Sequence, residues 1–202
     1  MTTPTQTKLT RRKALMFGFA ASVVVAQPAW ALSEAQARKL VDAVVRDINA
    51  VINSGKSEAG MIADFEQIFG RYADVPIMAR YALGVESRTA TKAQMTRFTK
   101  AFSGYISRKY GKRFREFIGG KIEVKSARAI NAGYEIRCTA FLRGESPFEV
   151  TFLVSGKSGQ DKFFNMFIEG INLLLTERTE IGALLDRRGG NIDQLTADLA
   201  KL

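Results

Sequence analysis

Apolar residues recur every three to four positions through the first half of the chain, a spacing typical of amphipathic helices. Four helices are expected before residue 120, over residues 33–52, 57–69, 74–84 and 91–118. Ser57 and Asp74 are predicted N-caps, and Thr91 with Gln94 forms a capping box. The fourth helix carries one broad apolar face, made of Met95, Phe98, Phe102, Tyr105, Ile106, Tyr110, Phe114 and Phe117.

After Gly119-Gly120 the pattern changes to segments rich in aromatic and β-branched residues, which predict strands. The expected strands cover residues 121–126, 134–142, 148–155 and 163–168. Short breaks separate them, so neighbouring strands should pair antiparallel. The helical spacing returns after Gly170 and continues through a last helix capped by Asn191. Helices, then strands, then helices indicate a single α+β domain over residues 32–202.

The residue inventory excludes several kinds of chemistry. The 202-residue chain has one cysteine and no histidine, so it can form neither an internal disulfide nor a histidine-based catalytic or zinc site. Cys138 is expected to be a packed structural thiol. Glu177 and Glu180 share a helix face and are expected to be solvated. Residues 156–158 (Gly-Lys-Ser) lack the upstream glycine of a phosphate-binding loop. No catalytic residue, metal site or cofactor is predicted.

Residues 1–31 have the pattern of a cleaved signal peptide. A basic segment from Lys8 to Lys13 precedes an apolar run of 13 residues, Ala14–Ala26, whereas a membrane-spanning helix needs about 20. The sequence Ala29-Trp30-Ala31 then fits a signal peptidase site, so Leu32 is the expected start of the mature chain. Arg11-Arg12 leaves the Sec and twin-arginine routes both open, and a retained anchor helix is the alternative. Export would place the protein in the periplasm of a Gram-negative cell, away from nucleic acid.

Positive charge is concentrated in one stretch of the predicted fourth helix. Residues 32–202 contain 26 basic and 20 acidic residues, and residues 97–116 contain seven basic residues against one acidic, which equals that whole excess. A basic face beside an aromatic face can lie on an anionic surface. The candidate docking residues are Arg108, Lys109, Lys112, Arg113 and Arg115. The alternative is a solvated outer face on a core helix.

Several short motifs, in order, resemble the MlaC family of periplasmic phospholipid-binding proteins, also known as toluene-tolerance proteins. They are Ala79-Arg80-Tyr81-Ala82-Leu83-Gly84, then Thr91-Lys92-Ala93-Gln94 with Phe98, Phe102 and Tyr110, then Met166-Phe167-Ile168-Glu169-Gly170-Ile171-Asn172-Leu173, and finally Leu184-Leu185 with Ile192-Asp193-Gln194-Leu195. The likeness extends from about Leu32 to Leu202. The related HpnM branch, associated with hopanoid synthesis, stays open as an alternative.

The resemblance implies a fold and a function. The fold would be α+β, with a curved, four-stranded antiparallel sheet packed against several helices (MlaC or NTF2-like) and an apolar pocket between them. Residue spacing and family topology together suggest that the pocket is lined by Tyr81, Phe98, Phe102, Tyr105, Phe152, Val154, Phe164, Met166 and Ile168. Phospholipid would be bound as cargo, and no enzymatic activity is expected.

The family also implies partners. A monomeric carrier would move phospholipid between an outer-membrane MlaA-like lipoprotein with its porin and an inner-membrane MCE-domain complex of an ABC transporter, which maintains outer-membrane lipid asymmetry. Two other functions remain as alternatives. The protein could be an NTF2-like pocket protein or enzyme acting on a hydrophobic small molecule, or an adaptor that only recruits a transporter.

Overall fold

The computed structural model describes residues 32–202, with the side chains of Phe114 and Arg115 excepted, so the predicted signal peptide at 1–31 lies outside it. The helices are α1 (Glu34–Ile52), α2 (Glu58–Tyr72), α3 (Val75–Leu83), α4 (Lys92–Gly111), α5 (Leu173–Arg187) and α6 (Ile192–Leu199), with 3₁₀ turns η1 (Gly84–Arg88) and η2 (Lys112–Arg115). The strands are β1 (Lys121–Ile130), β2 (Gly133–Phe141), β3 (Phe148–Ser155), β4 (Lys162–Ile168) and β5 (Ile171–Asn172).

The predicted N-caps are confirmed by hydrogen bonds between side chain and backbone. Ser57 accepts from the backbone N–H of Gly60, and Asp74 accepts from that of Ile77. Thr91 and Gln94 form the expected capping box at the start of α4. Each cap satisfies an N–H group that the first turn of a helix leaves without a partner, so these helices start where the local sequence specifies.

Helix α4 ends earlier than predicted, at Gly111, and the chain continues as the 3₁₀ turn η2. Gly111 lies against α2, because a Cβ atom built on it would be 3.0 Å from Ile62 Cγ1 and 3.2 Å from Ile62 Cα. Glycine is a poor helix former, and here it also permits the close approach of two helices. The prediction of one continuous helix to residue 118 was therefore wrong.

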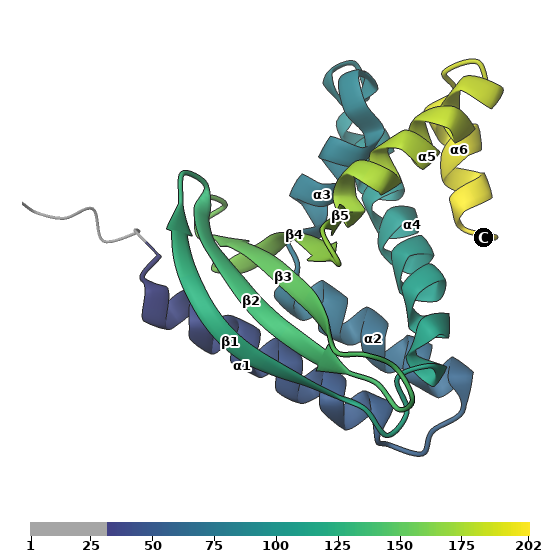
Figure 1. Cartoon of the computed structure of the whole chain (residues 1–202). Helices are drawn as coiled ribbons and strands as arrows, with labels where there is room; N and C mark the ends of the chain where they lie inside the picture. Colours follow the sequence, from purple (N-terminus) through teal and green to yellow (C-terminus); the bar gives the residue numbers. More distant parts are fainter. Residues whose placement is uncertain (1–31) are drawn as a thin grey trace, which may run out of the picture.

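The sheet is antiparallel in the order β1-β2-β3-β4-β5, which confirms the predicted α+β class. It has five strands where four were expected, because the short strand β5 pairs with the end of β4. Register shifts interrupt the β1–β2 pairing between Val124 and Ser126 and the β3–β4 pairing between Leu153 and Val154. Such irregularities bend and twist strands, and Figure 1 shows a strongly curved sheet.

The helices cover the sheet on one side and continue beyond it. Helix α1 runs along the sheet and packs on β1, while α2 packs on both α1 and α4 (Figure 1). Helix α3 packs against α5, and α4 packs against α6, which ends near the C-terminus. Phe98, Phe102 and Phe152 are among the largest fully buried side chains of the core. None of the helices within residues 32–202 is long and apolar enough to span a bilayer.

Candidate binding site: two adjoining apolar cavities

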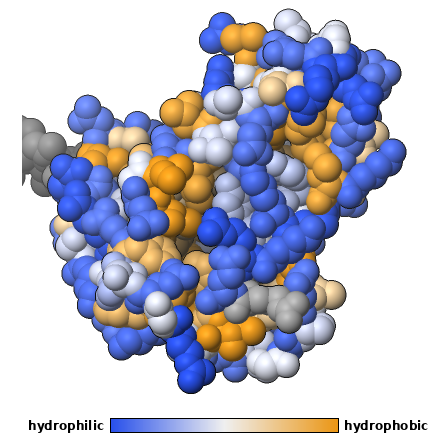
Figure 2. All heavy atoms as spheres, turned by 45° about the vertical axis from the view of Figure 1, so that its right-hand side comes forward, coloured by the Kyte–Doolittle hydropathy of each residue, from blue (hydrophilic) through white to orange (hydrophobic). Residues whose placement is uncertain are grey.

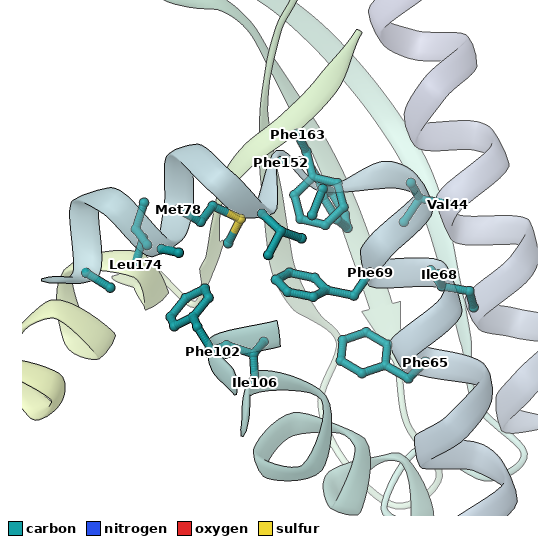
Figure 3. Close-up of a cluster of buried hydrophobic side chains, with 14 of the residues drawn as sticks. Val44, Phe65, Ile68, Phe69, Met78, Phe102, Ile106, Phe152, Phe163 and Leu174 are labelled. Atoms are coloured by element: carbon teal, nitrogen blue, oxygen red, sulfur yellow. The ribbon is translucent and has the colours of Figure 1, made fainter. Parts of the chain in front are cut away.

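An inner cavity of about 60 Å³ lies between β3–β4 and the helices. Figure 3 shows phenylalanine side chains from α2, α4 and the sheet directed toward a common space, among them Phe65, Phe69 and Phe102. Apart from Tyr110, Asn165 and Glu177, the wall is apolar. It consists of Val44, Ile48, Phe65, Ile68, Phe69, Met78, Phe102, Ile106, Phe152, Phe163, Met166, Leu173 and Leu174.

A larger outer cavity of about 370 Å³ adjoins the inner one. The two share five wall residues: Ile48, Phe65, Tyr110, Phe152 and Met166. The rest of the outer wall combines apolar side chains with a charged and polar rim, namely Arg113, Glu116, Phe117, Ile122, Leu142, Glu145, Ser146, Phe148, Val150, Ile168 and Glu169. Figure 2 shows apolar residues beside a hollow on one face, bordered by hydrophilic residues. The site therefore grades from a polar rim to an apolar interior.

Strand alternation explains which sheet residues line the cavities. Successive side chains of a strand point to opposite faces, so Val150 and Phe152 share the cavity face with Met166, which pairs with Phe152. The register shift after Leu153 places Phe163 opposite Val154. Phe163 consequently lines the inner cavity, whereas its neighbour Phe164 lines neither cavity.

Four of the nine predicted lining residues are on the cavity walls: Phe102, Phe152, Met166 and Ile168. Phe98 and Val154 are completely buried but belong to the packed core, and Phe164 is displaced by the register shift described above. Tyr105 is turned away, and its hydroxyl donates to Glu180 Oε2 over 3.1 Å. Tyr81 is 42% exposed.

A polar cluster at the inner cavity was not anticipated from the sequence. Glu177 is only 2% exposed, not solvated as expected. Its Oε1 accepts from Tyr110 OH over 2.6 Å and from Lys109 Nζ over 2.8 Å. Lys109 Nζ also donates to Glu180 Oε2 over 2.5 Å and to Tyr105 OH over 3.2 Å. The one sequence feature that pointed to this cluster was the helix face shared by Glu177 and Glu180. That feature by itself does not show that Glu177 is buried.

The cluster shifts the acid–base behaviour of its members. Burial lowers the pKa of Lys109, but hydrogen bonds to Glu177 and Glu180 outweigh it and hold that pKa well above its usual range. Burial, with a contribution from the charge of Glu177, raises the pKa of Tyr105 to about 12. Burial and the hydrogen bond to Glu177 also raise the pKa of Tyr110. Lys109 is therefore charged and both tyrosines are neutral at physiological pH.

The predicted docking residues divide into two groups. Arg108 and Lys109 are half-buried, and both side chains bond to other residues of the protein. Arg108 donates from Nη2 to the carbonyl of Leu199 over 2.7 Å. Lys109 belongs to the polar cluster with Glu177 and Glu180. Lys112 and Arg113 are exposed, and Arg113 also lies on the rim of the outer cavity. The side chain of Arg115 is outside the described structure. Only part of the basic stretch is thus free to contact a partner.

Neither a metal-binding cluster nor a reactive thiol is found in the part of the chain that the structure describes. Residues 32–202 contain no group of three potential ligands placed to hold a metal ion. Cys138 is 1% exposed, and burial, with a smaller contribution from the charge of Asp42, raises its pKa to about 12. Such a thiol is protonated at neutral pH and is a poor nucleophile, which agrees with the structural role expected for it.

The fold and its two cavities define a protein with an apolar internal binding site between a curved sheet and a helical layer. The MlaC protein family model matches residues 38–201. The chain therefore belongs to the MlaC family.

A solved structure with the same fold is a phospholipid-binding protein from Ralstonia solanacearum, determined in complex with a phospholipid. The two chains superpose with a TM-score of 0.68 at 22% sequence identity, and the match covers 81% of this chain and 98% of the other.

Proposed function

We propose that this protein is a periplasmic phospholipid carrier of an Mla-type ABC transport system. The observation that supports this most strongly is the pair of adjoining cavities, whose charged groups, apart from the buried Glu177, are gathered at one rim and whose interior is otherwise mainly apolar. Acyl chains would occupy the apolar interior, and the headgroup would stay near the rim. Family membership and the phospholipid in the Ralstonia protein support the same assignment.

The energetics of lipid transfer explain why an apolar cavity is sufficient for this function. Each buried methylene contributes about 0.8 kcal/mol, so two acyl chains with roughly 30 methylenes would cost on the order of 25 kcal/mol to expose to water. A carrier lowers this barrier by offering an environment comparable to the membrane interior. Moving a lipid between two such environments breaks no covalent bond, so the proposal includes no catalytic step.

The proposed partners are Mla components of the outer membrane and of the inner membrane. The carrier would exchange phospholipid with an outer-membrane MlaA-like lipoprotein and its porin, and with an inner-membrane MCE-domain complex attached to an ABC transporter. The exposed Lys112 and Arg113 support an electrostatic encounter with acidic surfaces, because Arg113 lies on the rim through which cargo would pass.

Lipid binding is tested by native mass spectrometry of protein purified from the periplasm without detergent. We expect a mass increase that dissociates as phospholipid, and transfer of that lipid to acceptor vesicles. A protein that is empty, does not load from phospholipid vesicles, and instead converts a hydrophobic ester or epoxide would support the NTF2-like enzyme.

Export is tested by sequencing the N-terminus of the secreted protein. Cleavage after Ala31 would leave Leu32 first and would preserve the capping box of α1, in which Ser33 Oγ accepts from the N–H of Gln36. Replacing Arg11 and Arg12 by lysine should block export by the twin-arginine route and not by Sec. A full-length chain retained in the membrane fraction would contradict cleavage.

A further inference from the structure

The rim of the outer cavity carries an excess of negative charge, although the protein as a whole is basic. Residues 32–202 contain 26 basic and 20 acidic residues. The charged side chains of the rim are one basic residue, Arg113, and three acidic ones, Glu116, Glu145 and Glu169. Arg113 and Glu116 pair with each other over 3.4 Å. Glu145 and Glu169 are exposed and form no ion pair among the described residues, so both carboxylates are available to the occupant of the cavity.

The strand register explains why these two carboxylates meet the same cavity. Glu145 lies in the turn between β2 and β3, where its backbone N–H donates to the carbonyl of Leu142 over 3.4 Å. Glu169 follows β4, and its N–H donates to the carbonyl of Glu149 over 3.0 Å. Because β3 pairs antiparallel with both β2 and β4, the two turns lie at the same end of the sheet. Arg113 reaches the rim from η2, so the rim combines an acidic part on the sheet with a basic group on the helical layer.

Phospholipid headgroups differ in the charge that they carry beyond the phosphate. Every phospholipid brings an anionic phosphate, which the guanidinium of Arg113 is suited to bind. An ethanolamine headgroup adds an ammonium group, which Glu145 and Glu169 would attract. A glycerol headgroup adds only hydroxyl groups and leaves the lipid with a net negative charge, which the same carboxylates would repel. Both effects favour the ethanolamine headgroup at this rim.

We propose that the rim of the outer cavity favours phospholipids whose headgroup ends in an ammonium group over anionic phospholipids with an uncharged headgroup, and that Glu145 and Glu169 make the distinction. This inference rests on the proposed lipid-binding function and adds a headgroup class to it. The acyl chains do not contribute to the preference, because they would occupy the apolar interior in both cases. The preference is modest, since charges on an exposed rim are weakened by water and salt.

The test compares two lipids with identical acyl chains and different headgroups. Lipid-free mature protein is incubated with vesicles that contain equal amounts of palmitoyl-oleoyl phosphatidylethanolamine and palmitoyl-oleoyl phosphatidylglycerol. The bound lipids are extracted and quantified by mass spectrometry against standards. Because exposed ion pairs are individually weak, the wild type should take up phosphatidylethanolamine in about threefold to tenfold preference at low salt. At about 0.5 M salt the Debye length is only a few ångström, and the preference should fall to about onefold.

The informative variant is Glu145→Gln/Glu169→Gln, which removes both free carboxylates from the rim and keeps the size of the side chains. Its preference at low salt should fall to about onefold. The matched control is Glu66→Gln/Asp186→Asn, because Glu66 and Asp186 are also exposed and line neither cavity. Both double variants change the net charge of the protein by the same amount, and the control should keep the wild-type preference. Circular dichroism confirms that each variant folds.

The outcomes separate this inference from the proposed function. Equal uptake of both lipids by the wild type, or a preference for phosphatidylglycerol, would overturn the inference and leave lipid carriage intact. A preference that survives in Glu145→Gln/Glu169→Gln, that is lost equally in the control, or that is insensitive to salt would also overturn it. Failure to load either lipid would overturn the proposed function as well. If the double variant does not fold, the single variants Glu145→Gln and Glu169→Gln replace it, and at least one of them should lose the preference.

Discussion

Lys109 Nζ on α4 lies 2.8 Å from Glu177 Oε1 on α5, and this ion pair joins two helices that both contribute to the inner cavity wall. The Glu177 side chain is 2% exposed and the Lys109 side chain 29%. Removing one partner of a buried pair is costly, because it leaves the other charge buried without compensation. The pair therefore fixes the position of α5 against α4 at the inner cavity.

Replacing Lys109 by methionine should destabilise the protein by about 3–5 kcal/mol, since Glu177 would keep only its bond from Tyr110. The measurement is the free energy of unfolding in urea at pH 7. Lys112→Met is the control, because Lys112 is exposed at the end of the same helix and its replacement should cost less than about 0.5 kcal/mol. Equal stability of the two variants would show that the Lys109–Glu177 pair contributes nothing.

Stability should decline at alkaline pH. The pKa values of Lys109 and Tyr110 are raised in the folded protein, and those of Tyr105 and Cys138 are raised to about 12. The folded state then holds these protons more tightly than the unfolded chain. Their contribution is complete below the unfolded thiol pKa of about 8.5 and is lost as the pH rises through the folded values.

Urea unfolding between pH 8 and 11 measures this decline. Cys138→Ala should delay its onset to about pH 10, where unfolded tyrosine and lysine begin to titrate. A stability that stays flat across this range in the wild type would contradict the raised pKa values.

Local sequence was sufficient for the helix starts and for the four longer strands, although β1 continues to Ile130, past its predicted end at Ser126, and β5 was missed. A capping box such as Thr91–Gln94 is formed by residues three apart, so its signal is contained in a few letters. Strand identity likewise followed from local residue composition. The burial of Glu177 could not be predicted in the same way, because Lys109, its partner, is 68 residues away.

Within the sheet, the cavity wall was predicted correctly only where strand alternation is regular. Phe152 and Met166 lie in a regular stretch of the β3–β4 pairing, and both line the cavities. One irregularity in that pairing brings Phe163 to the wall in place of Phe164. A register shift depends on how two strands meet, and nothing in either strand's own pattern marks it.

Two helical glycines should respond in opposite directions to alanine. A Cβ on Gly111 would meet Ile62 Cα at 3.2 Å, whereas a Cβ on Gly182 has nothing within 4 Å. Gly111→Ala should therefore destabilise by about 1–3 kcal/mol through overpacking. Gly182→Ala should stabilise by about 0.5–1 kcal/mol, because glycine is costly inside a helix. Thermal unfolding of both variants checks the sign, and an unaffected Gly111→Ala would refute the close contact of α2 with α4.

Neighbouring positions on β4 test whether the cavities hold lipid. Met166 lines both cavities and Phe164 lines neither, although both are half-buried. Met166→Asp should place an unpaired carboxylate among acyl chains, at a cost of several kcal/mol, and lose bound phospholipid in native mass spectrometry. Phe164→Asp should retain it. Circular dichroism confirms that each variant folds. Lipid retained in Met166→Asp, or lost equally in both, would show that the cargo binds elsewhere.

The exposed basic pair Lys112 and Arg113 should accelerate docking. Arg113 lies on the rim of the outer cavity, 3.4 Å from Glu116, and both of these side chains are more than half exposed. Exposed charges act mainly on the rate of encounter, and salt screens them over about 8 Å at physiological ionic strength. The Lys112→Gln/Arg113→Gln double variant should therefore transfer lipid to anionic acceptor vesicles more slowly at low salt, with its cargo retained.

The control for this pair is Arg88→Gln/Lys92→Gln, which removes the same charge from exposed positions at the other end of α4. It should transfer lipid at the wild-type rate. Arg108→Gln should behave differently again, since Arg108 bonds the Leu199 carbonyl. It should lower stability by about 1–2 kcal/mol, as loss of a charged hydrogen bond does, and leave the salt dependence of transfer unchanged. If both double variants slow transfer equally, the net charge of the protein governs the encounter, and the rim pair Lys112 and Arg113 has no special role. The basic stretch over residues 97–116 is then only the solvated outer face of a core helix.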